Sequence, residues 1–192
     1  MADDFLSKGK LIVYTMGNAQ AREEAKSTAT GNFEDGRLVV MVDETSASAS
    51  EIFTGAIQDW DRGVVVGRRT FGKGLVQRPI PLPDGSMIRL TVARYYTPTG
   101  RSIQKPYIKG NQEEYNRDLI ERYNRGELMS ADSIHFPDSL KYSTLETKRT
   151  VYGGGGIMPD VFIPVDTTLY SDYHRNLVAS GVVNRVAMNY LD

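Results

Sequence analysis

The sequence predicts an α/β fold built around a β-α-β unit, and three consecutive segments carry this prediction. Residues 38–42 form a continuous apolar run, which is typical of a central strand buried on both faces of a sheet. Residues 46–63 then place apolar side chains at helical spacing until a glycine ends the pattern. Residues 64–66 form a second apolar strand. Because strands joined by a crossover helix pair in parallel, we expect ligands to bind where the strands of this sheet meet its helices.

Flanking segments add strands to this unit. Residues 10–16 are rich in β-branched and aromatic side chains and predict a strand. Residues 19–36 are polar without a sustained period, which predicts a surface connection. The Asp-Gly pair at residues 84–85 is a hairpin turn signal, and it leads into a returning strand at residues 87–96.

The C-terminal half is more polar. We expect a polar insertion at residues 105–150 that contains a surface helix at residues 112–125. Four glycines at residues 153–156 predict a bend. The chain therefore divides into a main unit, residues 1–166, and a helical C-terminal segment, residues 167–192, whose apolar residues are spaced as in one or two helices.

Composition narrows the classes of function. The 192 residues carry 23 Lys and Arg against 24 Asp and Glu, so the net charge gives no reason to expect nucleic-acid binding. The absence of cysteine excludes disulfides, thiolate metal sites and a cysteine nucleophile. No apolar run reaches the roughly 18 residues that a membrane span needs. We expect neither a metal nor a cofactor.

Ser48 lies in the turn that joins the first buried strand to the helix. Backbone N–H groups at a helix N-terminus are unpaired and the helix dipole is positive there, so an oxyanion would be stabilised beside Ser48. The same residues, Ser48 to Glu51, also form the S-x-x-E pattern of a capping box, in which Ser48 only caps the helix. The local pattern alone favours the cap.

A catalytic serine needs a base, and Lys73 is the candidate. The two histidines, His135 and His174, lie in polar stretches away from the predicted strand ends, which indicates ordinary surface residues. A lysine can act as a base where burial disfavours its ammonium form. Lys73 lies between two glycines at the same predicted sheet end as Ser48, and these glycines would let the chain aim the lysine inward. An ordinary loop lysine remains the alternative.

A third interpretation, a phosphate-binding loop, is rejected. Residues 67–73 (GRRTFGK) match G-x-x-x-x-G-K after a strand. Gly74, however, stands where Ser or Thr would hold magnesium. The proline-rich segment that follows cannot form the helix whose N-terminus would bind phosphate. The sequence therefore does not predict nucleotide binding.

Three segments together resemble the core of carboxy-terminal processing (tail-specific) peptidases: SASASEIFTGAIQDWDRG, GRRTFGKGLVQ and DGSMIRLTVARYYTPTGRSIQ. The resemblance implies a serine endopeptidase that acts near the C-termini of protein or peptide substrates through an acyl-enzyme. It places the nucleophile at Ser48, the base at Lys73, a lysine-orienting glutamine at Gln77 and one oxyanion donor at the Ala49 N–H. The fold it implies is a Clp protease/crotonase-like α/β core, truncated at its N-terminal side, with C-terminal helices.

The chain departs from that family pattern at its N-terminal side. The family's second oxyanion donor and its peptide-binding PDZ domain have no counterpart in this sequence, so this segment alone is expected to be poorly active or inactive. The resemblance implies the bacterial periplasm or cell envelope, although the chain shows no export signal. A non-catalytic assembly module is the alternative function, in which an exposed sheet edge pairs with another copy to give a homo-oligomer.

Overall fold

The computed structural model describes residues 1–28, 31–107 and 111–167 of the chain. Within the C-terminal segment it describes residues 171, 173, 176–177, 180–182, 185–186 and 189. The predicted helical segment at residues 167–192 lies largely outside the described residues and stays a prediction.

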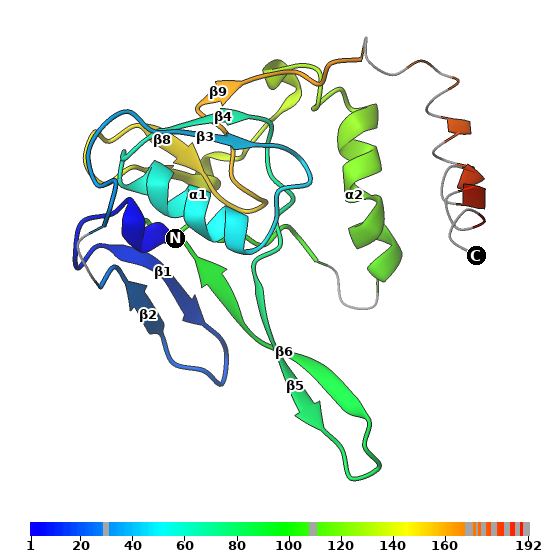
Figure 1. Ribbon diagram of the computed structural model, residues 1–192, viewed down its shortest axis with the longest axis horizontal. Coiled ribbons are helices and arrows are strands. Elements are labelled where there is room, and N and C mark those ends of the chain that lie inside the picture. The colour runs from blue at the N-terminus through cyan, green and yellow to red at the C-terminus, as the bar shows by residue number, and fades with distance from the viewer. Residues whose placement is uncertain are drawn as a thin grey trace.

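The predicted β-α-β unit is confirmed. Strands β3 (Val39–Val42) and β4 (Val64–Gly67) pair in parallel, and helix α1 (Ala49–Asp59) connects them. Strand β9 (Val161–Phe162) pairs in parallel with the other side of β4, so the sheet order is β3-β4-β9 (Figure 1). The turn at residues 43–48 joins β3 to α1, so Ser48, the N-cap of α1, lies beyond the C-terminal end of β3, where ligands are expected.

The prediction that residues 38–42 form a central strand buried on both faces is wrong. Strand β4 is the central strand, and β3 is an edge strand. Val42 of β3 and Val65 of β4 are buried, whereas Val39 and Met41 of β3 are 60% and 86% exposed. Helix α1 covers one face of this sheet, and within the described part of the chain the opposite face near β3 is left bare. Apolar composition therefore overstated the burial of this strand.

A second, antiparallel sheet has the order β2-β1-β6-β5. It contains β1 (Leu11–Met16), β2 (Glu23–Lys26), β5 (Leu75–Pro81) and β6 (Met87–Tyr96). The predicted surface connection at residues 19–36 thus contains strand β2, whose sequence EEAK is fully exposed and has no apolar alternation to reveal it.

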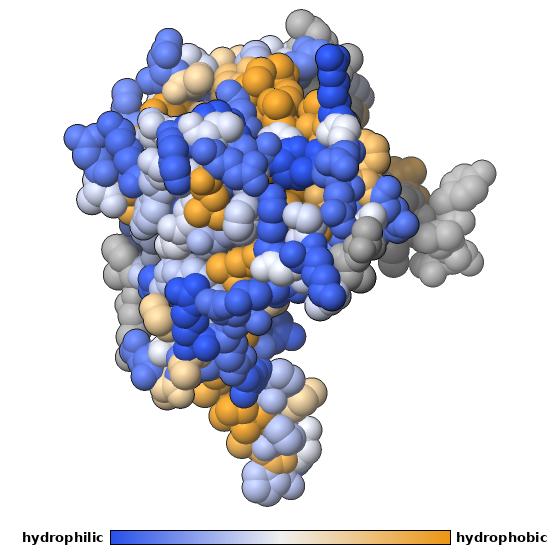
Figure 2. Space-filling model, turned by 90° about the vertical axis from the view of Figure 1, so that its left-hand side faces the viewer, coloured by the Kyte–Doolittle hydropathy of each residue, from blue (hydrophilic) through white to orange (hydrophobic). Residues whose placement is uncertain are grey.

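Strands β5 and β6 form a hairpin that projects from the body of the molecule (Figure 1). The predicted turn is confirmed, because the N–H of Gly85 donates to the carbonyl of Leu82 and Gly85 has a positive φ of 85°. Pro79 and Pro81 lie on β5, an edge strand of the sheet. Figure 2 shows apolar surface on this projection, where Ile80 and Ile88 face each other across the strands and are exposed.

The polar C-terminal half contributes an α-helix and a small two-stranded ribbon to the described structure. Helix α2 (Gln112–Asn124) confirms the predicted surface helix, and the Asn111 side chain caps it by accepting from the N–H of Glu114. Strands β7 (Lys141–Ser143) and β8 (Thr150–Tyr152) form a small antiparallel ribbon. Short 3₁₀ turns occur at Ala2–Asp4, Ala131–Ser133 and Asp138–Leu140.

Among the residues that the structure describes, no helix has the length and apolar character needed to cross a membrane.

The apolar core fixes α1 against the first strands. Leu6, Ala56 and Ile57 are buried together, and partly buried side chains such as Phe53 and Trp60 pack around them. The Trp60 indole N–H also donates to the carbonyl of Leu11 at 2.8 Å, which joins the end of α1 to β1. Helix α1 therefore starts at the candidate site and is anchored at its far end.

Asp61, two residues beyond the end of α1, joins this end of the helix to the turn at residues 144–149. It accepts hydrogen bonds from the Thr147 N–H and from the Arg149 Nε–H, both at 2.8 Å. Burial by itself raises the pKa of Asp61, but the hydrogen bonds from Thr147 and Arg149 outweigh burial and lower the pKa from 3.8 to about 2.

Replacing Asp61 with asparagine is expected to lower the free energy of unfolding by about 2 kcal/mol at pH 7. A carboxyl with a depressed folded-state pKa stabilises the fold above its unfolded pKa, here 3.8, and loses that contribution as the pH falls toward 2. The difference between wild type and Asp61→Asn should therefore shrink between pH 4 and pH 2. Urea unfolding across this range measures it, and a difference that does not change with pH would contradict the assignment.

Candidate active site

Ser48 adopts a backbone conformation that an ordinary helix cap does not need. It is the N-cap of α1, with φ of 58° and ψ of −115°. An N-cap residue normally has extended dihedral angles, and a non-glycine residue in a sparsely populated region costs on the order of 1–3 kcal/mol. Such strain persists where the surroundings fix it and is concentrated at active sites. The conformation of Ser48 favours the catalytic interpretation over the simple cap.

Asp43 fixes the turn that precedes Ser48. One of its carboxylate oxygens accepts from the N–H groups of Thr45 and Ser46, at 3.0 and 2.9 Å, and from both of their hydroxyls. Burial raises the pKa of Asp43, but these hydrogen bonds outweigh it and the pKa lies below 3.8. The turn that presents Ser48 is therefore held by a carboxylate that stays ionised at neutral pH.

Glu51 joins the Ser48 turn to the Lys73 loop. Its side chain is fully buried, and one oxygen, Oε2, accepts from the Ser48 N–H at 2.9 Å and from the Lys73 N–H at 2.8 Å. The other oxygen, Oε1, accepts from the Thr70 hydroxyl at 2.5 Å and from the Gly72 N–H at 2.6 Å. A single carboxylate thus brings together the two residues that the sequence predicted to act as a pair.

The Lys73 side chain does not lie as expected. The glycines on either side of Lys73 do let the loop lie close to the neighbouring segment. A Cβ on Gly74 would lie 2.6 Å from the Gln104 backbone nitrogen, and Gly72 has a positive φ of 88°. The Lys73 side chain itself is exposed, not aimed inward. The described residues therefore position the backbone of the candidate base but do not bury its amine.

Ala49 and Gln77 are placed less decisively. The N–H of Ala49 is in the first turn of α1 and has no acceptor among the described residues, as an oxyanion donor requires. Gln77 lies on β5, is exposed, and donates to the Thr91 hydroxyl at 3.4 Å. The structure records no hydrogen bond between Gln77 and Lys73, so the role of Gln77 stays a prediction.

The loop geometry agrees with the rejection of a phosphate loop. A phosphate loop binds its ligand through free backbone N–H groups. Here the N–H groups of Gly72 and Lys73 donate to Glu51, and that of Gly74 donates to the Gln104 side chain at 2.9 Å. The described residues also contain no group of three or more His, Cys, Asp or Glu side chains placed to hold a metal ion.

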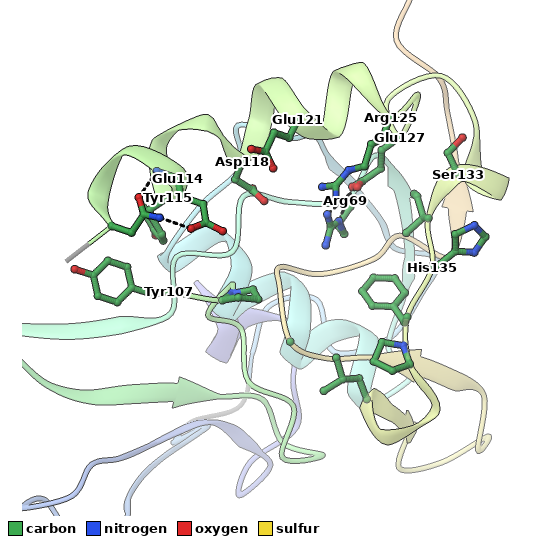
Figure 3. Close-up of a pocket in the computed structure, with 17 residues that line it drawn as sticks. Arg69, Tyr107, Glu114, Tyr115, Asp118, Glu121, Arg125, Glu127, Ser133 and His135 are labelled. Atoms are coloured by element: carbon green, nitrogen blue, oxygen red, sulfur yellow. Dashed lines mark hydrogen bonds and ion pairs between the residues drawn. The ribbon is translucent and has the colours of Figure 1, made fainter. Parts of the chain in front are cut away.

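A separate cavity of about 540 Å³ lies between α2 and residues 133–137 (Figure 3). Carboxylates from α2, including Asp118 and Glu121, line one side, and His135 lies on the opposite side. Ser48 and Lys73 are not among its lining residues. The exposed position of His135 agrees with an ordinary surface histidine, whereas His174 lies outside the described residues.

Sequence reasoning identified Glu51 only as part of a capping box, and it missed Gln104. The structure contains the half of the capping box in which the Glu51 carboxylate accepts from the Ser48 N–H. The contacts of Glu51 with Thr70, Gly72 and Lys73 span 19 to 22 residues of sequence, and no local pattern predicts them.

Comparisons with known proteins find similar sequences over part of this chain. A family model described as Peptidase family S41 matches residues 1–113. The carboxy-terminal-processing protease of Bartonella bacilliformis is 45% identical over 105 residues, which make up 54% of this chain and 24% of that protein. The carboxyl-terminal-processing protease of Picosynechococcus sp. is 48% identical over 94 residues, which make up 49% of this chain and 22% of that protein.

A solved structure extends the match to the fold. The photosystem II D1 C-terminal processing protease aligns with a TM-score of 0.56 and 28% identity, over 85% of this chain and 29% of that one. The predicted α/β class with a Clp protease-like core is confirmed. The chain spans less than a quarter of the length of these two sequence relatives.

Proposed function

This chain belongs to peptidase family S41, and we propose that it forms the C-terminal part of the catalytic core of a carboxy-terminal processing serine endopeptidase. Ser48 is the nucleophile and Lys73 the general base. The observation that carries this proposal is the shared carboxylate of Glu51, which accepts from the backbone N–H groups of both residues. The strained backbone of Ser48 supports the same assignment.

The proposed reaction is acyl transfer. The neutral amine of Lys73 removes the proton from the Ser48 hydroxyl as the serine oxygen attacks the scissile carbonyl. The Ala49 N–H donates to the oxyanion that forms, and Gln77 orients the lysine. The amine-side peptide leaves with a proton from Lys73. Water then attacks the acyl-enzyme, Lys73 takes a proton from this water and passes it to the Ser48 oxygen, and the acyl group leaves as a carboxylic acid.

The rest of the whole protein is needed to complete the active site. The Lys73 side chain is exposed among the described residues, and a lysine base needs a drier environment. We assign the burial of Lys73, the second oxyanion donor and the docking of the substrate to sequence outside these 192 residues, in agreement with the greater length of the relatives. The same resemblance leads us to propose a location in the bacterial periplasm or cell envelope.

A fluorophosphonate probe tests the assignment in the full-length protein. The probe should label a peptide that contains Ser48, and Ser48→Ala should abolish both labelling and cleavage of a peptide substrate. Lys73→Ala should lower the cleavage rate by about 10³-fold or more. Ser50→Ala is the matched control, because Ser50 is an exposed serine in the same helical turn, and it should cleave like wild type. Cleavage that survives Ser48→Ala or Lys73→Ala would refute the dyad.

A further inference from the structure

Gln104 lies behind the Lys73 loop, in the segment that follows β6. Its side chain is 5% exposed, and both ends of its amide are used. The Oε1 atom accepts from the Gly74 N–H, and the Nε2 atom donates to the Lys105 carbonyl, each at 2.9 Å. A buried side chain that supplies one acceptor and one donor to two backbone groups fixes the path of both segments.

The neighbouring residue, Lys105, holds the other side of the same loop. Its backbone N–H donates to the Gly72 carbonyl at 3.0 Å, so Gln104 and Lys105 together contact the glycines on either side of Lys73. The Lys105 amine is itself fixed to α2, where it donates to the Tyr115 carbonyl at 3.0 Å and pairs with Asp118 at 3.1 Å. The segment behind the loop is therefore anchored on both sides.

The Lys73 backbone is consequently held between two buried side chains. Glu51, on the helix that begins at Ser48, accepts from the N–H groups of Gly72 and Lys73. Gln104 accepts from the N–H of the next residue, Gly74. No comparable contact restrains the exposed Lys73 side chain within the described residues. These two side chains therefore fix the point on the backbone from which the Lys73 side chain extends.

We infer that Gln104 is a positioning residue for the peptidase reaction: it holds the Lys73 backbone where the lysine amine can reach the Ser48 hydroxyl, and it does not touch the substrate. This inference rests on the proposed function. It also explains the residue type, since the site needs an uncharged side chain with one donor and one acceptor, which glutamine provides. Displacement of a catalytic group by about 1 Å can cost about 10²-fold in rate.

The test compares Gln104→Met with Gln104→Glu in the full-length protein. Gln104→Met keeps the volume but removes both hydrogen bonds. It is expected to lower the second-order rate of fluorophosphonate labelling and kcat by about 10- to 100-fold, with KM and the final fraction of labelled protein unchanged. Gln104→Glu should recover most of this rate, because burial favours the protonated carboxylic acid, which also supplies one acceptor and one donor.

Gln58→Met is the matched control. Gln58 is 1% exposed and donates to the Met158 carbonyl and to Asp160, both at 2.9 Å, near the end of α1 that is remote from Ser48. Gln58→Met should lower the midpoint temperature of thermal unfolding. It should leave the second-order rate of fluorophosphonate labelling of the folded protein unchanged.

The outcomes separate the inference from the proposed function. If Ser48→Ala or Lys73→Ala still cleaved substrate, the proposed function and the role of Gln104 would both fall. If those variants were inactive while Gln104→Met labelled at the wild-type rate, only the role of Gln104 would fall. A loss in Gln104→Met that appeared solely as a smaller labelled fraction would also overturn it, because that result reports unfolding and not misplacement.

Discussion

Glu51→Gln is expected to reduce peptidase activity by more than about 10²-fold and to destabilise the fold at the same time. The carboxylate accepts four hydrogen bonds, and glutamine replaces one accepting oxygen with an amide nitrogen that can only donate. The Thr70 hydroxyl can turn to accept from this nitrogen, but the backbone N–H of Gly72 cannot. At least one buried N–H would lose its acceptor.

The expected loss of stability follows from the charge. Hydrogen bonds to a charged group contribute about 1.5–3 kcal/mol each, so losing one or two of them should lower the free energy of unfolding by about 1.5–6 kcal/mol. Urea unfolding measures this, and fluorophosphonate labelling of Ser48 in the full-length protein measures the activity. Glu113→Gln is the control, because Glu113 is 73% exposed on α2 and its ion pair with Arg117 lies at the surface, so the effect of this replacement should stay below about 0.5 kcal/mol. Wild-type labelling by Glu51→Gln would show that the shared carboxylate is not needed.

Arg101→Met should give the largest loss of stability among replacements away from the active site. Arg101 and Asp59 form an ion pair whose side chains are 1% and 0% exposed. Removing one partner of a buried pair leaves the other charge uncompensated and typically costs about 3–5 kcal/mol. Asp59 would retain its two hydrogen bonds from Thr99, at 2.8 Å each, which places the expected cost nearer 3 kcal/mol than 5.

The control for this second prediction is Arg117→Met. Arg117 also pairs with a carboxylate, Glu113, but the two side chains are 64% and 73% exposed and lie four residues apart on α2. Such pairs contribute about 0.3–0.5 kcal/mol. Denaturant unfolding of both variants should therefore separate them by at least about 2 kcal/mol. Equal losses would mean that the buried pair adds no more than a surface pair does.

The sequence predicted the elements that are determined by residues close together in the chain. The helix after Ser48, the strands on either side of it and the turn at residues 84–85 follow from periodicity and turn chemistry. Ser48 and Lys73 were predicted from their place at strand ends and from the family resemblance, and the structure brings their backbones together.

The features that were missed depend on distant parts of the chain. The exposure of β3 is set by what packs on its faces, and its apolar sequence is the same whether or not a face is covered. Strand β2 has no apolar face, so only its pairing with β1 defines it. The exposure of Lys73 likewise depends on neighbours and not on its flanking glycines.

The prolines of the projecting hairpin have a consequence for solubility. Strand β5 is the last strand of its sheet, and a proline can occupy such a strand when its missing N–H faces outward. Pro79 and Pro81 are two residues apart, so they remove donors from the same side of the strand. Another extended chain therefore finds too few hydrogen-bond donors to extend the sheet there. A projecting hairpin with exposed apolar side chains can in this way protrude into solvent without seeding aggregates of stacked strands.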